Sequence, residues 1–147
     1  MSESVKEINV GLLAYGAIGD EHSRAITAVN GLRLAAVADT NPDRLSAAKD
    51  LAPDITTFTD SLQMLDSGLL DLVVISTPPN SHYLWAKESL NRGLNVILEK
   101  PMALSVEHCD ELMALAASKN LLLVVYQNRR FDADFITIKK YLLIYYC

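Results

Sequence analysis

The sequence predicts an α/β protein built on a doubly wound parallel β-sheet. Six short apolar runs alternate along the chain with segments of helical character, and the connections between them are short. The runs are continuously apolar, whereas a strand with one solvent-exposed face alternates apolar and polar residues. Continuous apolar strands are typical of a parallel sheet that helices cover on both faces.

The first half of the chain supplies three of the six strands. The run 8–14 ends just before two closely spaced glycines, Gly16 and Gly19. The run 32–38 (LRLAAVA) is followed by Asp39. Asn41 is a suitable N-cap and Pro42 a suitable first residue for the helix 42–51. The predicted strands are 8–14, 32–38 and 56–58, and the predicted helices are 20–29, 42–51 and 61–66.

The second half repeats the pattern. Gly93 closes the helix 81–92, and Ser105 is the expected N-cap of the helix 106–119. The predicted strands here are 70–76, 94–98 and 121–126.

Two regions of unequal size are expected. Residues 1–126 form the sheet domain, and residues 127–147 begin a linker toward a second domain that is missing from this chain. Residues 141–147 (YLLIYYC) are all apolar or aromatic and carry no stop signal, so they suggest a truncated chain, as a premature stop or frameshift would produce. The alternative is a final strand or helix that docks on the core.

Bulk composition excludes several classes of function. A net charge of −5 gives no basic surface for nucleic acid or for an anionic membrane. No apolar run approaches the roughly 20 residues that a transmembrane helix needs, and residues 1–7 do not resemble a signal peptide. Two cysteines, Cys109 and Cys147, make no disulfide framework. We therefore expect a soluble cytoplasmic protein.

A glycine-rich turn between the first strand and the first helix predicts a phosphate site. Residues 14–19 (AYGAIG) match G-x-G-x-x-G except that Ala14 replaces the first glycine. Gly16 would let the backbone approach a diphosphate, Gly19 would let the helix pack close to the strand, and the helix N-terminus offers free N–H groups. The alternative is a tight strand-to-helix turn without a ligand. Gly11 lies inside the strand, too early to belong to the turn.

Asp39 ends the second strand, twenty residues after Gly19. A carboxylate there can accept hydrogen bonds from an adenosine ribose and repel a 2′-phosphate, which favours NAD over NADP in a Rossmann fold. The alternative is an aspartate that only caps a helix or stabilises a turn. Arg44 is close enough in sequence to accommodate a 2′-phosphate, so NADP stays a possible cofactor.

Polar residues follow three later strands, at the sheet edge where such folds bind ligands. Residues 76–82 (STPPNSH) can line a dinucleotide or simply lead into a helix capped by Asn80 or Ser81. Glu99 and Lys100 follow the fifth strand, where Lys100 can orient a substrate hydroxyl or belong to a solvated surface pair. Residues 127–131 (QNRRF) can face a substrate or form a charged linker. No histidine is assigned as a base, and no Cys/His cluster has metal-ligand spacing.

Five segments together resemble one known family. In chain order they are VGLLAYGAIGDEH, VADTNPDR, STPPNSHY, LEKPMALS and YQNRRFDADF. They are similar to segments of the glucose–fructose oxidoreductase, inositol dehydrogenase and rhizopine-catabolism family (Gfo/Idh/MocA), and Glu99-Lys100-Pro101 is the most diagnostic. The resemblance implies an N-terminal NAD(P)-binding Rossmann domain of an oxidoreductase that acts on sugars, cyclitols or related polyols.

The resemblance also implies roles for individual residues. Those implied to contact or line the dinucleotide are Gly16, Ala17, Ile18, Asp39, Thr77, Pro78, Asn80 and His82. Glu99 and Lys100 would lie beside the nicotinamide, with Lys100 as the catalytic lysine, and Asn128 and Arg129 would approach the substrate. The family's second domain supplies a catalytic aspartate and histidine, most substrate contacts and the dimer interface. Its absence leaves homo-oligomer formation open.

Three other functions remain as alternatives. The chain can be a dinucleotide-binding module without turnover, which suits its short length. It can be a methyltransferase-like domain that binds S-adenosylmethionine, since such domains have a similar glycine turn, although the later motifs have no use there. It can also be an interaction protein that assembles through residues 141–147.

Overall fold

Six parallel strands form one sheet in the order β3-β2-β1-β4-β5-β6 in the computed structural model, which describes residues 7–145, and side chains as far as residue 142. The strands are β1 (Ile8–Leu13), β2 (Leu32–Ala38), β3 (Thr56–Phe58), β4 (Leu72–Ile75), β5 (Asn95–Leu98) and β6 (Leu123–Val125). The chain starts near the middle of the sheet, builds outward to β3, and then returns to build outward to β6. This order confirms the predicted doubly wound sheet.

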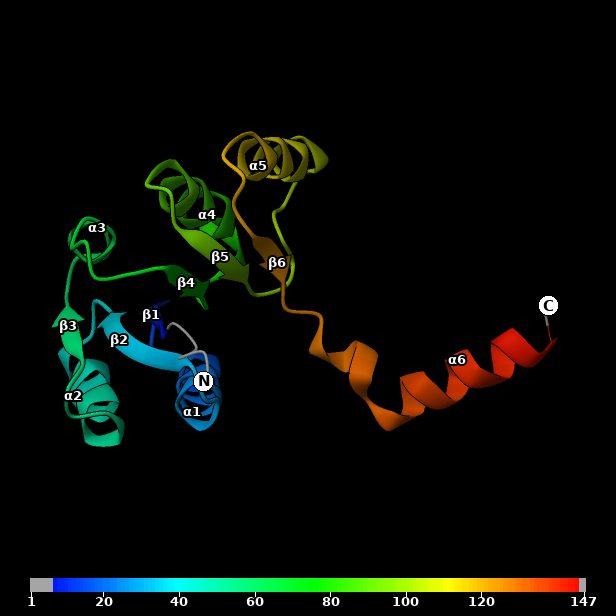
Figure 1. The fold of residues 1–147 in the computed structure, drawn as a ribbon, viewed down its shortest axis with the longest axis horizontal. Helices are drawn as coiled ribbons and strands as arrows, with labels where there is room; N and C mark the ends of the chain where they lie inside the picture. The colour runs from blue at the N-terminus through cyan, green and yellow to red at the C-terminus, as the bar shows by residue number, and fades with distance from the viewer. Residues whose placement is uncertain (1–6, 146–147) are drawn as a thin grey trace, which may run out of the picture.

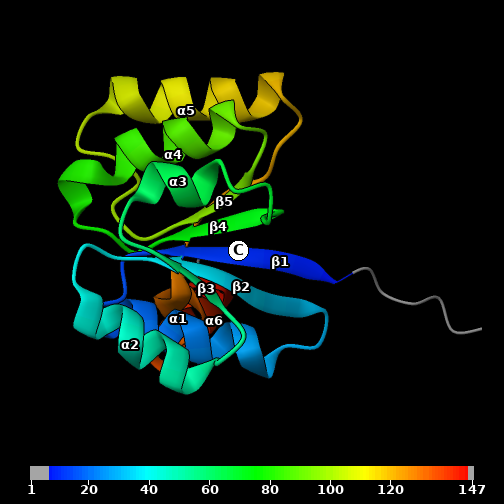
Figure 2. The ribbon, with the colours of Figure 1, turned by 90° about the vertical axis from the view of Figure 1, so that its left-hand side faces the viewer.

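Helices cover the two faces of the sheet as separate layers. Figure 2 shows α1 and α2 on one face and α3, α4 and α5 on the other. These helices are α1 (Ala17–Ala28), α2 (Pro42–Leu51), α3 (Ser61–Leu65), α4 (His82–Asn91) and α5 (Val106–Ser118), with 3-10 turns η1 (Pro79–Ser81) and η2 (Asn128–Phe131).

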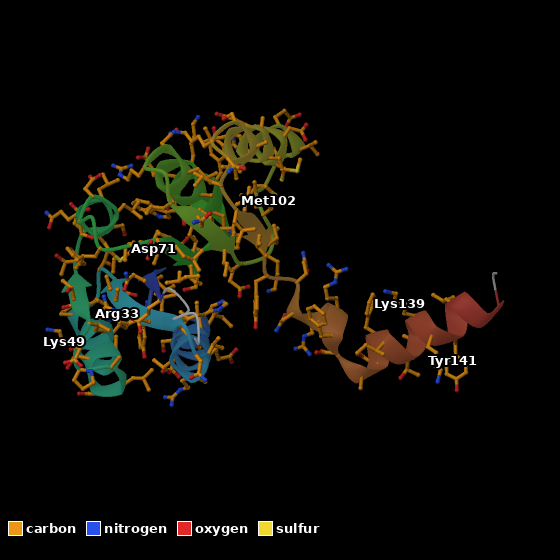
Figure 3. The ribbon with its side chains drawn as sticks, in the orientation of Figure 1. Arg33, Lys49, Asp71, Met102, Lys139 and Tyr141 are labelled. Carbon is orange, nitrogen blue, oxygen red and sulfur yellow. The ribbon has the colours of Figure 1, made fainter. Side chains whose placement is uncertain are left out.

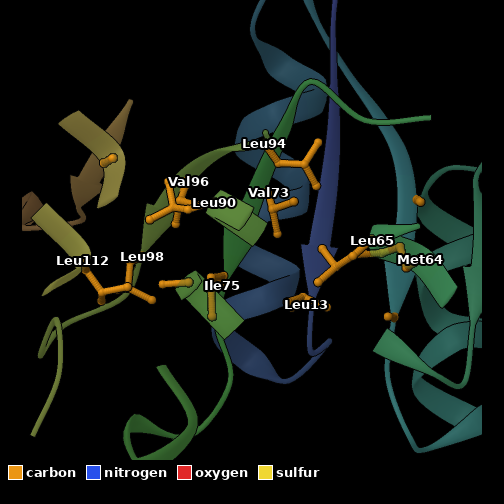
Figure 4. Close-up of a cluster of buried hydrophobic side chains, with 14 residues drawn as sticks. Leu13, Met64, Leu65, Val73, Ile75, Leu90, Leu94, Val96, Leu98 and Leu112 are labelled. Atoms are coloured by element: carbon orange, nitrogen blue, oxygen red, sulfur yellow. The ribbon is translucent and has the colours of Figure 1, made fainter. Parts of the chain in front are cut away.

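Each central strand contributes side chains to two cores. In β4, Val73 and Ile75 pack into the core under α3, α4 and α5, which Figure 4 shows, while Leu72 and Val74 pack into the core under α1 and α2. Burying each such side chain contributes about 1.5–3 kcal/mol. Because neither face of β4 meets water, all of its positions are apolar, which explains the continuous run in the sequence.

The predicted helix boundaries marked by capping residues are confirmed. The Asn41 side chain accepts a hydrogen bond from the Asp43 amide at 2.9 Å, and the Ser105 hydroxyl accepts one from the His108 amide at 3.3 Å. Gly93 follows α4 with a φ of +78°, a left-handed conformation that favours glycine. The predicted strands 70–76 and 121–126 are shorter in the structure because only their central residues pair with neighbours.

The first helix begins three residues earlier than the predicted start at residue 20. α1 begins at Ala17, and Gly16 is its N-cap with an extended backbone (φ −84°, ψ −165°). The sequence interpretation was wrong here because Gly19, a poor helix former, lies within the first turn of the helix. As a consequence the glycine turn supplies the first free amides of α1 directly.

The segment after β6 contains a helix that the sequence analysis did not predict. α6 (Ala133–Tyr145) follows η2 and extends away from the sheet (Figure 1), and every side chain described on it, residues 133–142, is exposed. Figure 3 shows Lys139 and Tyr141 projecting from it, far from the sheet. Residues 141–145 are thus helical, and the two side chains described among them, Tyr141 and Leu142, are exposed. The last two residues of the predicted truncated end lie outside the described residues.

Candidate functional site

The glycine turn has the backbone geometry of a phosphate-binding turn. Ala14 has a φ of +70°, a left-handed conformation, at the position where the sequence motif expects glycine. A Cβ on Gly19 would lie 2.4 Å from the Ala14 carbonyl oxygen, so only glycine allows this close contact between turn and helix. A Cβ on Gly16 would meet nothing within 4 Å. The space in front of Gly16 is therefore open to a ligand.

The N-terminus of α1 is free to bind an anion. The first intrahelical bond runs from the Asp20 amide to the Gly16 carbonyl at 2.9 Å, and Gly16 provides no side-chain cap. The amides of Ala17, Ile18 and Gly19 precede that bond and have no intrahelical acceptor. Together with the partial positive charge of the helix N-terminus, they form a site that suits a diphosphate.

Asp20 places a carboxylate in the same helical turn. It accepts hydrogen bonds from the Arg24 guanidinium at 2.9 Å and from the Tyr15 hydroxyl at 3.0 Å. The hydrogen bonds from Arg24 hold the pKa of Asp20 below its ordinary value, while burial raises the pKa of the Tyr15 hydroxyl. Because Arg24 compensates its charge, Asp20 repels an incoming phosphate less than a free carboxylate would.

Asp39 connects the end of β2 to the glycine turn. Its Oδ2 accepts a hydrogen bond from the Tyr15 amide at 2.7 Å, its Oδ1 accepts one from the Asn41 amide at 2.8 Å, and its side chain is 4% exposed. The N-cap of α2 is Asn41, so Asp39 is not the helix cap that the alternative interpretation expected. It does stabilise a turn, and in addition it faces the glycine bend as a ribose-binding carboxylate would.

Arg44 lies on the solvent side of this carboxylate. Its guanidinium is 3.4 Å from Asp39 Oδ2, and its side chain is 52% exposed. A negative charge at Asp39 disfavours a 2′-phosphate, while the half-exposed Arg44 cation beside it favours one. The two residues therefore act in opposite directions on the choice between NAD and NADP.

A pocket of about 270 Å³ lies beyond the carboxyl ends of β5 and β6. Five residues that the sequence analysis selected line it together, namely Ile18, Glu99, Lys100, Asn128 and Arg129. The other lining residues are Glu21, His22, Ala25 and Tyr126. Since Ile18 belongs to the glycine turn as well as to the pocket, a ligand bound at the turn can reach Lys100 without crossing the core.

Lys100 is the free cation of this pocket. Its side chain is exposed, and among residues 7–142 no hydrogen bond or ion pair involves its Nζ. The neighbouring Glu99 carboxylate instead contacts the His22 Nε2 at 2.9 Å. Glu99 therefore pairs with His22, and not with Lys100 as the alternative of a solvated surface pair expected.

The loop after β4 supports the site from the other side. The Ser76 hydroxyl donates to the Ala14 carbonyl at 2.8 Å and so ties this loop to the glycine turn. Thr77 is half-buried and accepts a hydrogen bond from the Ser81 hydroxyl at 2.9 Å, while Pro78 and Asn80 are exposed. These three residues are available to a ligand at this edge of the sheet.

His82 occupies a different position from the one its assigned role requires. Its side chain is almost fully buried, with Nδ1 2.7 Å from the Pro101 carbonyl oxygen and Nε2 2.8 Å from the Thr77 carbonyl oxygen. A ring enclosed in this way cannot touch a dinucleotide. We therefore revise its role from lining the site to holding the loops after β4 and β5 together.

Sequence reasoning missed His22, which pairs with Glu99 across 77 residues of chain. One local signal could have found it. His22 follows Gly19 by three residues, so both lie on the α1 face that packs against the strand ends. His108, by contrast, is exposed and stacks on Tyr83 at 3.8 Å, away from the pocket.

Residues 7–145 contain no group of three or more histidine, cysteine, aspartate or glutamate side chains placed to hold a metal ion. Within the same residues no helix is both long enough and apolar enough to cross a bilayer.

Relatives of known sequence share this domain but are much longer. The oxidoreductase YdgJ of Escherichia coli (strain K12) is 34% identical over 133 residues, which is 90% of this chain and 38% of YdgJ. The NADP(+)-linked scyllo-inositol 2-dehydrogenase IolW of Bacillus subtilis (strain 168) is 31% identical over 137 residues, covering 92% of this chain and 37% of IolW. The chain thus spans less than half the length of these relatives.

A solved structure has the same fold over nearly the whole of this chain. The scyllo-inositol dehydrogenase of Lactobacillus casei with bound NAD(H) and scyllo-inositol superposes with a TM-score of 0.85 at 27% identity, covering 95% of this chain and 42% of that one. The model of the oxidoreductase family with an NAD-binding Rossmann fold, GFO_IDH_MocA, matches residues 8–127. The chain therefore belongs to the Gfo/Idh/MocA oxidoreductases and contains their NAD-binding Rossmann domain.

Proposed function

We propose that this chain is the cofactor-binding part of an NAD-dependent oxidoreductase that transfers hydride to or from a sugar, cyclitol or related polyol. The observation that carries the proposal is the position of Lys100. Its ammonium, which has no partner among the described side chains, lies in a pocket that Ile18 shares with the glycine turn. A cation placed there can donate a hydrogen bond to a substrate hydroxyl or carbonyl oxygen beside the reacting end of a dinucleotide.

The residues of the sheet edge fit a dinucleotide. The amides of Ala17 and Ile18 would bind the diphosphate in the open space before Gly16, and Asp39 would accept hydrogen bonds from the adenosine ribose. Thr77, Pro78 and Asn80 would line its middle. The nicotinamide supplies the hydride chemistry, and the protein orients it and controls its surroundings.

The substrate is proposed from chemistry and from the relatives together. A polyol presents several hydroxyl groups, and the pocket offers Lys100, Asn128 and Arg129 as donors beside the Glu99 carboxylate. IolW is named for scyllo-inositol, and this chain matches 37% of its length. We infer that Asn128 and Arg129 lie on the substrate side of the cofactor.

Dinucleotide binding is tested by titrating the 147-residue chain with NADH, NADPH and S-adenosylmethionine in parallel by calorimetry. We expect NADH to bind, S-adenosylmethionine not to bind, and NADPH to bind more weakly than NADH. Replacing Asp39 by asparagine keeps an acceptor for the Tyr15 amide but removes the charge, so the preference for NADH should fall by about tenfold, or about 1.4 kcal/mol. Binding of S-adenosylmethionine but not NADH would contradict the proposal.

The role of Lys100 is tested with Lys100→Ala and the matched control Lys49→Ala, which removes an exposed lysine from α2. A lysine that acts on the substrate contributes little to cofactor affinity, so both variants should bind NADH within about twofold of the unmodified chain, a difference of about 0.4 kcal/mol. A large loss of NADH affinity in Lys100→Ala alone would assign Lys100 to cofactor binding instead.

The second candidate function is a dinucleotide-binding module without turnover. It is favoured by the coverage of the relatives, since the matched segment is about two fifths of their length. On a panel of sugars and inositols, we expect the chain alone to bind NADH but to turn over slowly or not at all. Vigorous dehydrogenase activity would exclude this second candidate.

A further inference from the structure

We propose that His22 and Glu99 are positioning residues that keep the Lys100 ammonium unpaired in the pocket. The inference rests on the role given to Lys100 in the proposed function, because a lysine must be free of internal partners to meet a substrate oxygen. It adds to that function two residues with a defined task, which they perform through Lys100.

The pair is well enclosed for a contact between charged or polar side chains. The His22 Nε2 lies 2.9 Å from Glu99 Oε1, and the two side chains are 9% and 13% exposed. The carboxylate can only accept a hydrogen bond, so in this contact Nε2 carries the hydrogen and donates it. Screening by water is weak at such burial, which makes the contact stronger than an exposed pair.

Each oxygen of Glu99 has a partner other than the ammonium of its neighbour. Oε1 is held by His22, and Oε2 accepts a hydrogen bond from the Lys100 backbone amide at 3.3 Å. Without His22, Oε1 of Glu99 would have no partner, and Lys100 is the next residue in the chain. An adjacent, flexible lysine pairs readily with an uncommitted carboxylate. His22 thus determines which side chain Glu99 hydrogen-bonds.

The imidazole is itself held in place from a third element. The ring of Tyr126, at the end of β6, meets the His22 ring edge-on, with centroids 4.8 Å apart and planes at 62°. This is a favourable geometry for two aromatic rings. The contacts join α1, β5 and β6, so the helix that bears the phosphate turn and the strand end that bears Lys100 are kept in register.

The inference is tested by the reactivity of Lys100 toward trinitrobenzenesulfonate, which modifies only uncharged amines. The labelled peptide is quantified by mass spectrometry against Lys49 in the same sample. In His22→Phe, the released Glu99 should pair with the ammonium and slow labelling of Lys100 by about fivefold, as expected for a contact of about 1 kcal/mol. His22→Gln, which keeps an amide donor, should restore labelling to the rate of the unmodified chain.

Two controls separate this effect from general damage to the fold. His108→Phe removes an exposed histidine from α5 and should leave Lys100 labelling unchanged. The double variant His22→Phe/Glu99→Gln has no carboxylate to release, so labelling should return to the original rate. The proposal is overturned if His22→Phe labels like the unmodified chain, or if slow labelling persists in the double variant.

A second measurement needs no variant. The tautomer of His22 can be read from ¹⁵N NMR of the unmodified chain, where we expect hydrogen on Nε2. A ring that carries hydrogen only on Nδ1 cannot donate to Glu99, and that result would also overturn the proposal. Neither experiment contains dinucleotide, so their failure is distinguishable from a failure to bind NADH.

Discussion

Substitutions of the two glycines at the start of α1 should separate an effect on stability from an effect on cofactor binding. A Cβ on Gly19 would lie 2.4 Å from the Ala14 carbonyl oxygen, a backbone atom that cannot move aside without shifting the turn. Overpacking of this kind costs about 1–3 kcal/mol, and a contact this short belongs at the upper end. Replacing a helical glycine by alanine returns about 1 kcal/mol. We therefore expect Gly19→Ala to destabilise the chain by about 2 kcal/mol.

Gly16→Ala is the matched variant three residues away. Its Cβ would meet nothing within 4 Å, and the backbone at Gly16 is extended, so alanine fits without strain. Loss of a glycine N-cap and the reduced entropy of the unfolded chain each amount to about 0.5–1 kcal/mol and act in opposite directions. The new methyl group would, however, fill the open space before the turn. Losing one hydrogen bond to a charged phosphate weakens binding by about tenfold or more.

The assay is urea unfolding followed by circular dichroism, combined with NADH titration. With a slope of about 2 kcal/mol per molar urea, Gly19→Ala should lower the midpoint by about 1 M, whereas Gly16→Ala should leave it nearly unchanged. NADH affinity should fall in Gly16→Ala. The reasoning is refuted if Gly19→Ala unfolds at the original midpoint, or if Gly16→Ala binds NADH as tightly as the unmodified chain.

Three further changes test the remaining geometry. Ala14→Gly should stabilise the chain by about 0.5–1 kcal/mol in urea unfolding, because relief of a left-handed alanine (about 1–2 kcal/mol) exceeds the entropic cost of glycine. His82→Leu should cost about 2 kcal/mol or more in the same assay, because it removes a buried ring that links two loops and leaves a backbone carbonyl without its donor. Lys87, which hydrogen-bonds Glu111 across α4 and α5, holds the pKa of Glu111 below its ordinary value. A carboxyl whose pKa is lowered by folding stabilises the protein above its unfolded pKa and loses that contribution as pH falls through the folded value. The melting temperature should therefore fall less steeply with acid in Lys87→Met than in the unmodified chain, and parallel curves would argue against the contact.

The local parts of the fold were accessible from the sequence because their signals are local. The ranges predicted for β2, α2 and β3 agree with the structure, since Asp39, Asn41 and Pro42 mark the boundary between β2 and α2 unambiguously. α6 was not predicted because it lacks the polar face that identifies a surface helix. Its last residues also belong to the run 141–147, whose seven successive apolar or aromatic residues show no helical periodicity. The start of α1 was misplaced because glycine content opposes helix formation where the turn requires it.

By itself, the sequence determined the order of strands and helices and the glycine turn, because hydrophobic periodicity and capping act over a few residues. The tertiary structure alone decided which side chains meet. It placed Glu99 against His22 rather than Lys100, and enclosed His82 between two loops where it was expected to face the ligand. The reason is that the parallel sheet brings strand ends from distant parts of the chain to one edge. Which atoms then pair depends on side-chain directions that the spacing of residues along the chain does not encode.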